Sequence, residues 1–150
     1  MPRIPRSLVD EMVAHAREDL PNEACGMIHG SATGEPTELY RVTNKAASPY
    51  RYDMEGTEIA RLELQRARNG EELFAIYHSH VASEARPSMT DIRMAFFPPL
   101  TDETRDISQL IYPDAFYILV SLQDAEAPSV RAFHIVAAEP HIIEEPIEVV

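Results

Sequence analysis

The stretch that decides the fold is residues 73–91, LFAIYHSHVASEARPSMTD. It begins with an apolar run of aromatic and branched side chains, residues 73–77, which follows a polar turn and predicts a buried strand. Side chains of a strand alternate between its two faces, so His78 and His80 project to the same side, about 7 Å apart along the strand. Two imidazoles in this arrangement are well placed to bind one metal ion.

The second half of the stretch adds a carboxylate. Pro87 cannot continue the strand, and residues 88–91 open a segment with helical spacing. Asp91 lies in the first turn of that helix, from which it can reach back to the histidines as a third ligand. Two histidines and one carboxylate are a common ligand set of catalytic zinc, with the fourth position left for water.

Each half of the stretch also has a purely structural interpretation. A His-x-His pair on a strand usually binds no metal, and Ser88 followed by Asp91 is typical of a helix N-cap with its capping box. The His-x-His pair and the Ser88–Asp91 segment occur together, at this spacing and at the end of a strand. This combination favours a metal site over two separate structural roles. The capping role remains compatible with it, because a capping Ser or Asp has spare hydrogen-bonding capacity.

His-Ser-His, seven residues and then Ser-x-x-Asp resembles the signature of the JAMM (MPN+) metalloproteases, zinc isopeptidases that act on ubiquitin-like proteins. That family also has a glutamate after its first helix, and Glu23 matches it. The resemblance runs from about residue 5 to about residue 137 and is closest to the short bacterial members. The segment SPYRYD, residues 48–53, fits these members too.

The resemblance implies a JAMM/MPN-like (cytidine-deaminase-like) architecture and one zinc ion (Zn2+) held by His78, His80 and Asp91. It implies that Glu23, which is not a ligand, takes the proton of the attacking water and passes it to the departing amine. The Ser88 hydroxyl would stabilise the oxyanion.

The resemblance also implies the partner. The family cleaves a peptide or isopeptide bond after a Gly-Gly tail, which is narrow enough to enter a groove as an added strand. Some short bacterial members process ubiquitin-like sulfur-carrier proteins by removing an amino acid or a short peptide. We expect that class of partner rather than deubiquitination, and we leave homodimer formation open.

Length and composition limit the number of domains and the classes of partner that the protein can have. The chain has 150 residues, 45% of them hydrophobic and 25% charged, and a formal net charge of −12. This length suits a single domain, residues 1–150. The acidic balance argues against a nucleic-acid partner, which requires a basic face. Because no apolar run could span a bilayer, residues 1–20 lack a signal-peptide core and Cys25 has no disulfide partner, we expect a cytoplasmic protein without membrane contact.

Periodicity predicts the other elements. Helical spacing predicts helices over residues 7–20 and 58–69, the second capped by Thr57. Strands are predicted for four apolar segments and for the tail, as an edge strand: residues 24–30, 39–42, 116–120, 130–136 and 139–150. Helices before and between runs of strands predict an α/β (α+β) fold, a mixed sheet flanked by helices.

After Asp91 the helical pattern continues to residue 97, where Pro98 and Pro99 end it. Residues 98–113 have the character of an insertion loop, polar in the first half and apolar at residues 110–112. Long loops in compact domains are usually functional or disordered. We expect this loop either to cover a bound tail or to be a surface insertion.

The remaining reactive side chains favour structural roles. His15 is expected to be partly exposed and His29 to be exposed. Cys25 is expected to be a small buried side chain, with a thiol whose oxidation inhibits the enzyme as the alternative. Ser79, which points away from the two histidines, is expected to orient the following loop.

Three rival functions are weaker. A non-catalytic MPN scaffold lacks the ligands that this chain has. A DNA-repair-associated JAMM-like protein typically carries a further DNA-binding region, for which this acidic chain has no room. A zinc deaminase needs a Pro-Cys-x-x-Cys segment, and the chain contains one cysteine.

Overall fold

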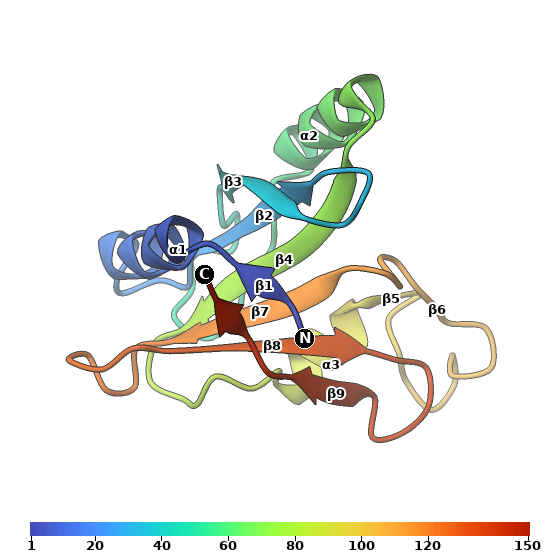
Figure 1. The fold of residues 1–150 in the computed structure, drawn as a ribbon. Coiled ribbons are helices and arrows are strands. Elements are labelled where there is room, and N and C mark those ends of the chain that lie inside the picture. Colours follow the sequence, from blue (N-terminus) through green and yellow to red (C-terminus); the bar gives the residue numbers. More distant parts are fainter.

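The computed structural model describes residues 1–150, and its centre is a six-stranded mixed sheet with the strand order β3-β2-β4-β7-β8-β9 (Figure 1). The strands are β2 (Cys25–Gly30), β3 (Pro36–Val42), β4 (Glu72–His80), β7 (Phe116–Ser121), β8 (Ser129–Ile135) and β9 (Ile142–Glu145). Strands β4 and β7 are parallel, and the other neighbouring pairs are antiparallel. The predicted mixed sheet is confirmed, including the edge strand from the tail.

Three helices and two small strand pairs complete the fold. They are α1 (Arg6–Glu18), α2 (Gly56–Asn69) and α3 (Met89–Met94), with β1 (Arg3–Ile4) against β10 (Glu148–Val149) and β5 (Phe96–Phe97) against β6 (Gln109–Leu110). The parallel pair β1–β10 brings the two ends of the described chain together (Figure 1). None of the three helices combines the length and the apolar character needed to cross a membrane.

Strand β4 is apolar because both of its faces are covered. Ala75 and Tyr77 pack in one cluster with the buried stripe of α1, which includes Leu8 and Met12. Ile76, on the opposite face, packs against α3 and β5. A strand buried on both sides needs apolar residues at every position, which explains the unbroken run at 73–77. The face of Ile76 continues to His78 and His80, so both imidazoles lie on the α3 side of the sheet.

Two details of the helices differ from the predictions. The N-cap of α2 is Glu55, whose carboxylate accepts a hydrogen bond from the Thr57 N–H, so the prediction that Thr57 caps the helix is wrong. The prediction that α3 extends to residue 97 is also wrong. The helix ends at Met94, and Phe96 pairs with Leu110 in the β5–β6 hairpin. Phe96 is apolar because this hairpin presses it into the core beside Ile76.

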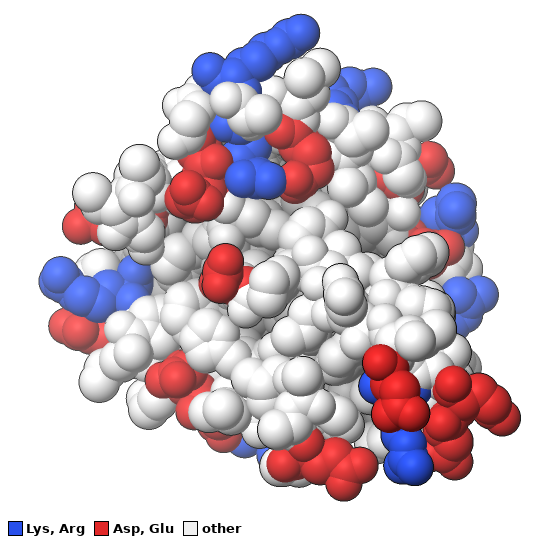
Figure 2. Space-filling model, turned by 90° about the vertical axis from the view of Figure 1, so that its right-hand side faces the viewer, with Lys and Arg blue, Asp and Glu red and all other residues white.

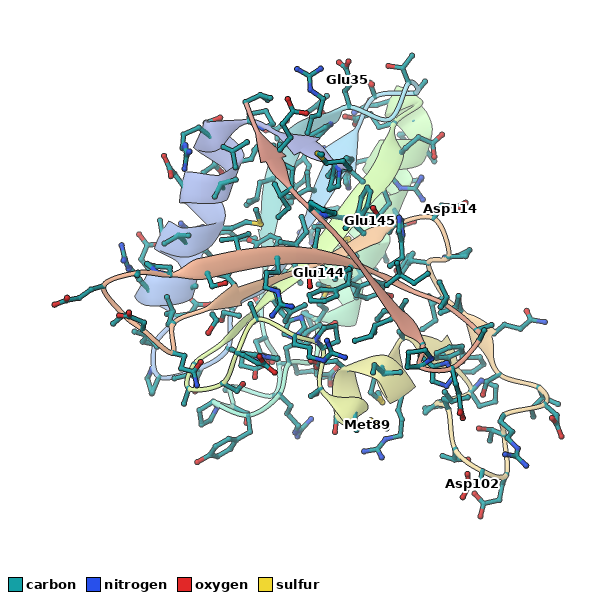
Figure 3. All side chains as sticks on the ribbon, turned by 60° about the horizontal axis from the view of Figure 1, so that its bottom comes forward. Glu35, Met89, Asp102, Asp114, Glu144 and Glu145 are labelled. Carbon is teal, nitrogen blue, oxygen red and sulfur yellow. The ribbon has the colours of Figure 1, made fainter.

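Residues 98–113 comprise the connection of that hairpin, its strand β6 and part of the chain that leads to β7. The Thr104 hydroxyl donates to the Pro99 carbonyl at 2.7 Å, and the Ser108 hydroxyl donates to the Pro98 carbonyl at 2.7 Å. Figure 3 shows Asp102 at the outer end of this connection, away from the sheet. Its polar part therefore has its own hydrogen bonds, while the later residues Leu110 and Tyr112 pack against the core.

Both histidines that were expected to have exposure are buried. His15 Nδ1 lies 2.7 Å from the Tyr77 hydroxyl, and the ring is 3% exposed. His29 is fully buried, with its ring centroid 4.6 Å from that of Tyr40. The prediction for His29 is wrong because β2 continues past the apolar run to Gly30, and every residue of this strand is buried.

The packing around β2 leads to a prediction at Gly26. A Cβ atom at this position would lie 2.4 Å from Cε1 of Tyr77 and 2.5 Å from the Tyr40 carbonyl oxygen. Gly26→Ala should therefore lower the free energy of unfolding by about 1–3 kcal/mol, as overpacking does, in a denaturant titration. The control is Gly56→Ala, where the added atom meets nothing within 4 Å. Equal unfolding midpoints for the two variants would contradict the packing described here.

Candidate metal and catalytic site

His78, His80 and Asp91 converge at the end of β4. Asp91 Oδ2 lies 3.1 Å from Nε2 of His78 and 3.1 Å from Nε2 of His80. One ligand atom from each of the three residues lies within 4.8 Å of the other two. All three side chains are at most 9% exposed. Two imidazole nitrogens and a carboxylate oxygen, gathered and shielded from water, could hold a metal ion, and the donor set fits the zinc expected from the sequence.

The start of α3 fixes the position of the Asp91 carboxylate. The Ser88 hydroxyl accepts a hydrogen bond from the Asp91 N–H at 3.0 Å, and the Ser88 N–H donates to Asp91 Oδ2 at 2.8 Å. This is the capping box that the sequence predicts. The Ser88 hydroxyl uses a lone pair in the cap and keeps its own proton for another acceptor. Capping and catalysis are thus compatible at both residues.

Different contacts orient the two imidazoles. His80 Nδ1 lies 2.8 Å from the Glu84 carbonyl oxygen, so this nitrogen carries the proton and Nε2 offers its lone pair to the site. Nδ1 of His78 has no hydrogen-bond partner. Instead, the ring of Tyr52 stacks on the His78 ring, with centroids 4.2 Å apart and planes 26° apart. Tyr52 therefore restricts the rotation of His78 by packing.

The electrostatics favour a charged carboxylate beside the imidazoles. Burial acts to raise the pKa of Asp91, but attraction to His78 and hydrogen bonds from both histidines hold that pKa well below its usual range. Burial lowers the pKa of His78. For His80, burial acts in the same direction, but the bonds to Asp91 and to the Glu84 carbonyl outweigh it and raise the pKa. The ionised state of Asp91 is the state that a metal ion requires.

Glu23 lies just before β2 and has an unusual environment. The residue is 4% exposed, and its Oε1 atom is buried without a hydrogen-bond partner. Burial raises the pKa of Glu23 to about 7, while His80 and Asp91 are close enough to shift it further in opposite directions. A carboxyl group with this pKa can both accept and return a proton near neutral pH.

The backbone around Glu23 is tied to the metal-binding strand. The Ser79 hydroxyl accepts a hydrogen bond from the Ala24 N–H at 2.8 Å, and the Ser79 N–H donates to the Ala24 carbonyl at 3.0 Å. The prediction that Ser79 orients the following loop is therefore wrong. Its side chain faces away from His78 and His80 and holds the segment that carries Glu23.

Two clefts border the site. The polar cleft, with a volume of about 500 Å³, has Glu23 on its wall, together with His15, Glu18, Asp19, Asn22, Arg41, Asn44 and Glu58. The apolar cleft, with a volume of about 240 Å³, has Asp91 on its wall, together with Tyr52, Met54, Ile59, Met94, Ile111 and Tyr112. Figure 2 views the molecule from the side of α2 and the β5–β6 hairpin and shows a hollowed central region with few charged side chains. Glu23 and Asp91 therefore each border a different cleft.

Cys25 does not belong to the cluster of His78, His80 and Asp91. Its side chain is fully buried and donates to the Val42 carbonyl at 3.5 Å. Burial raises the pKa of the Cys25 thiol to about 12, which suppresses the reactive thiolate form. The structure favours the small buried side chain over the oxidation-sensitive thiol.

Sequence reasoning did not find Tyr52 or the residues of the apolar cleft. Tyr52 lies in the SPYRYD segment, whose match to short bacterial members was the only signal available. The sequence marks Ile111 and Tyr112 as apolar, but nothing in the pattern places them beside Asp91.

Comparison with known proteins identifies a matching family model and similar relatives. The family model described as prokaryotic homologs of the JAB domain matches residues 5–136. The chain is 38% identical over 146 residues to the CysO-cysteine peptidase of Mycobacterium tuberculosis (strain H37Rv), covering 95% of this chain and 87% of that protein.

Two solved structures are similar in fold. Protein DSY2949 from Desulfitobacterium hafniense has a TM-score of 0.79 and 29% identity, with 100% of this chain and 93% of that chain covered. AF2198, a JAB1/MPN domain protein from Archaeoglobus fulgidus, has a TM-score of 0.56 and 18% identity, with 100% and 99% covered. The predicted MPN-like architecture is confirmed. By its family match and its identity to a named peptidase, the chain belongs to the prokaryotic JAB-domain family, as a short member of the JAMM/MPN+ group, and is a hydrolase.

Proposed function

We propose that this chain is a zinc-dependent peptidase that hydrolyses the peptide or isopeptide bond after the C-terminal Gly-Gly of a ubiquitin-like or sulfur-carrier protein. The observation that carries the proposal is the convergence of His78, His80 and Asp91 beside the unpartnered carboxyl oxygen of Glu23. The identity to a CysO-cysteine peptidase supports a peptidase acting on a protein-linked amino acid.

The ligand roles follow from the orientation of the donors. Nε2 of His78, Nε2 of His80 and a carboxylate oxygen of Asp91 would hold one zinc ion. When bound, zinc would lower the pKa of a coordinated water to roughly 7 and so make a nucleophile available at neutral pH. The stacking of Tyr52 on His78 and the bond from His80 to Glu84 restrict the two imidazole rings and would keep their Nε2 atoms available to the ion.

An amide also needs proton transfer and charge stabilisation. Glu23 takes a proton at Oε1 from the attacking water and delivers it to the nitrogen of the departing amine. The raised pKa of Glu23 suits both halves of that transfer. The Ser88 hydroxyl donates its free proton to the oxygen of the scissile carbonyl, where negative charge develops.

The apolar cleft is the proposed site of the carrier tail. It is lined mainly by hydrophobic side chains, lies between α2, α3 and the chain that follows β6, and borders Asp91. A Gly-Gly tail has no side chains that would prevent its backbone from approaching the reacting centre. Ile111 and Tyr112 place the end of the 98–113 segment on the wall of this cleft, which supports a role of that segment in substrate binding.

The metal assignment is testable without a substrate. After reconstitution, the purified protein should contain about one equivalent of zinc, and His80→Ala should lose most of it, because a three-residue site cannot spare a ligand. His134→Ala is the control, since that ring packs against Phe116 outside the site. Elemental analysis measures the metal. Less than about a tenth of an equivalent in the wild-type chain, or full retention in His80→Ala, would exclude this site.

Glu23→Gln should keep the fold and the zinc but lower kcat by about 10²–10⁴-fold, because it removes proton transfer and no ligand. Glu11→Gln, at an exposed position of α1, is the matched control. Steady-state kinetics on a Gly-Gly-linked carrier fusion measures the effect. Loss of zinc would make Glu23 a ligand, and near-normal turnover would assign the base to another residue.

Ile111→Ser should raise KM for the carrier fusion by about tenfold with little change in kcat, because it removes apolar surface from the proposed tail site. Ile107→Ser is the control. Ile107 is in the same segment and is 65% exposed, against 47% for Ile111, but it does not line the apolar cleft. Equal KM values for the two variants would place the tail elsewhere.

A further inference from the structure

Three tyrosines from different parts of the chain line the apolar cleft. Tyr52 lies between β3 and α2, Tyr112 lies between β6 and β7, and Tyr117 belongs to β7. Tyr117 pairs with Ile76 of β4, two residues before His78, so its side chain is on the face of the sheet that carries the proposed metal ligands. The ring of Tyr52 stacks on that of His78. The three tyrosines therefore line the cleft next to the proposed metal site.

None of these three hydroxyl groups has a hydrogen-bond partner within the chain, in contrast to the hydroxyls of Tyr77 and Tyr40. The Tyr77 hydroxyl lies 2.7 Å from Nδ1 of His15, and the Tyr40 hydroxyl donates to Glu38 at 3.1 Å. Tyr117 is only 5% exposed, yet its hydroxyl is not sealed from solvent. A largely buried hydroxyl without a protein partner is costly, and a molecule in the cleft that offers an acceptor would satisfy it.

The three hydroxyls also lie near one another and keep their protons. Burial raises the pKa of Tyr52, and the neighbouring Asp91 and Tyr117 raise it further. Burial likewise raises the pKa of Tyr117, with a further contribution from Tyr112. All three groups are therefore neutral hydrogen-bond donors near neutral pH, directed at a common space.

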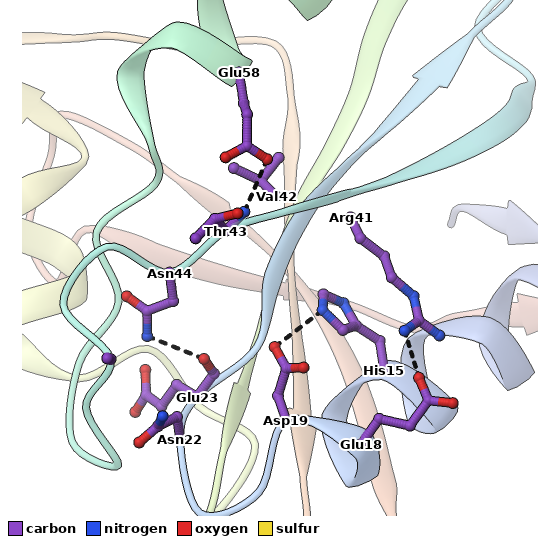
Figure 4. A pocket seen from close by; sticks show the side chains of 11 residues that line it. His15, Glu18, Asp19, Asn22, Glu23, Arg41, Val42, Thr43, Asn44 and Glu58 are labelled. Carbon is purple, nitrogen blue, oxygen red and sulfur yellow. Dashed lines mark hydrogen bonds and ion pairs between the residues drawn. The ribbon is translucent and has the colours of Figure 1, made fainter.

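The polar cleft differs in this respect. Arg41 on its wall is ion-paired with Glu18, and Asp19 Oδ2 lies 3.1 Å from Nε2 of His15 (Figure 4). These polar groups have partners within the chain. The unused donors are in the apolar cleft.

The lining of the apolar cleft decides which acceptor fits. Its other side-chain donors, Arg51 and Thr90, are exposed, so the tyrosines supply the donors of the buried wall. The negative charge of Asp91 disfavours an anion there, which leaves a neutral acceptor such as a peptide carbonyl. A Gly-Gly tail in this cleft buries backbone carbonyl groups and brings no polar side chain to satisfy them, and each buried carbonyl requires a donor.

We propose that the hydroxyls of Tyr52, Tyr112 and Tyr117 hold the carrier tail by its main chain, donating hydrogen bonds to carbonyl oxygens of the residues that precede the scissile bond. The assignment rests on the proposed function, which brings the tail into this cleft. Packing fixes the donors, since Tyr52 stacks on His78 and the other two rings belong to the apolar cluster of Ile76. Main-chain bonds give an extended peptide its affinity without a contribution from its side chains.

Phenylalanine substitutions test the hydroxyls alone. Tyr52→Phe, Tyr112→Phe and Tyr117→Phe each keep the ring and remove the donor, so the zinc content should not change. Affinity for the free carrier that ends in Gly-Gly, the product of cleavage, should fall about three- to tenfold in each variant, the effect of one lost hydrogen bond. Calorimetric titration of the zinc-loaded protein measures it. Tyr50→Phe, in the segment of Tyr52 and 88% exposed, is the control and should bind as the wild type does.

Kinetics separate tail binding from the chemical step. On a carrier fusion with one residue after Gly-Gly, the three variants should raise KM by about the same factor and leave kcat within about twofold. A variant that keeps KM and loses kcat would place its hydroxyl in the chemical step and overturn its assignment to the tail. Loss of zinc in Tyr52→Phe would make that hydroxyl a support of the metal site and overturn its assignment as well.

A change in the tail identifies the accepting atoms. Replacing a carbonyl oxygen by sulfur, at each of the three residues before the last glycine in turn, gives a weaker acceptor of similar shape. At one position or more, this replacement should weaken binding to the wild type and have a smaller effect on the matching phenylalanine variant. Losses that are additive at every position would overturn the inference.

Failure of this assignment and failure of the proposed function give different results. If the wild type cleaves the fusion and the three variants bind the free carrier as tightly as it does, the peptidase stands and the tyrosine assignment is overturned. If the zinc-loaded wild type neither binds the carrier nor cleaves the fusion, both are overturned. Binding that depends on the hydroxyls, without cleavage, would overturn the proposed reaction alone.

Discussion

The contact on which the site depends is the one that Asp91 Oδ2 makes with three nitrogen atoms at once. It faces Nε2 of His78 and Nε2 of His80 at 3.1 Å each, and it accepts the Ser88 N–H at 2.8 Å. The first two contacts come from the end of a strand and the third from the start of a helix. A single carboxylate oxygen therefore joins two elements and fixes how α3 meets β4. Asp91 thus belongs both to the cap of α3 and to the proposed metal-ligating set.

The sheet explains why such a polar cluster can be buried. Strand β4 lies inside the sheet between β2 and β7, with α1 on one face and α3 on the other. Hydrophobic packing up to Tyr77 holds the strand in place, and His78 and His80 extend it to the rim. Glu23 lies just before the neighbouring strand β2, and the hydrogen bonds of Ser79 to Ala24 hold this segment. The proposed base is thus tied to β4, which carries two of the proposed ligands, and this gives a rigid support to groups that must act together.

The sequence predicts the parts of this site that are encoded locally. His78 and His80 share a face because a strand alternates, and Asp91 returns to them because Ser88 and Asp91 form a capping box. The contributions of Tyr52 and Ile111 could not be predicted in the same way, since each depends on a contact between segments far apart in the chain. At Phe96 the pattern predicts helix where the structure has a hairpin, because two turns of helix and a short strand have similar apolar patterns over so few residues. His29 was misplaced because its burial is set by the neighbouring strands, not by its own segment.

The central claim is that His78, His80 and Asp91 together form one nitrogen- and oxygen-donor metal site. X-ray absorption at the zinc edge of the zinc-loaded protein tests it most directly. The account predicts only nitrogen and oxygen neighbours at about 2.0–2.2 Å, with the multiple-scattering signature of two imidazoles, falling to one in His80→Ala. A sulfur neighbour at about 2.3 Å, which would implicate Cys25, or an imidazole count unaffected by His80→Ala, would contradict it.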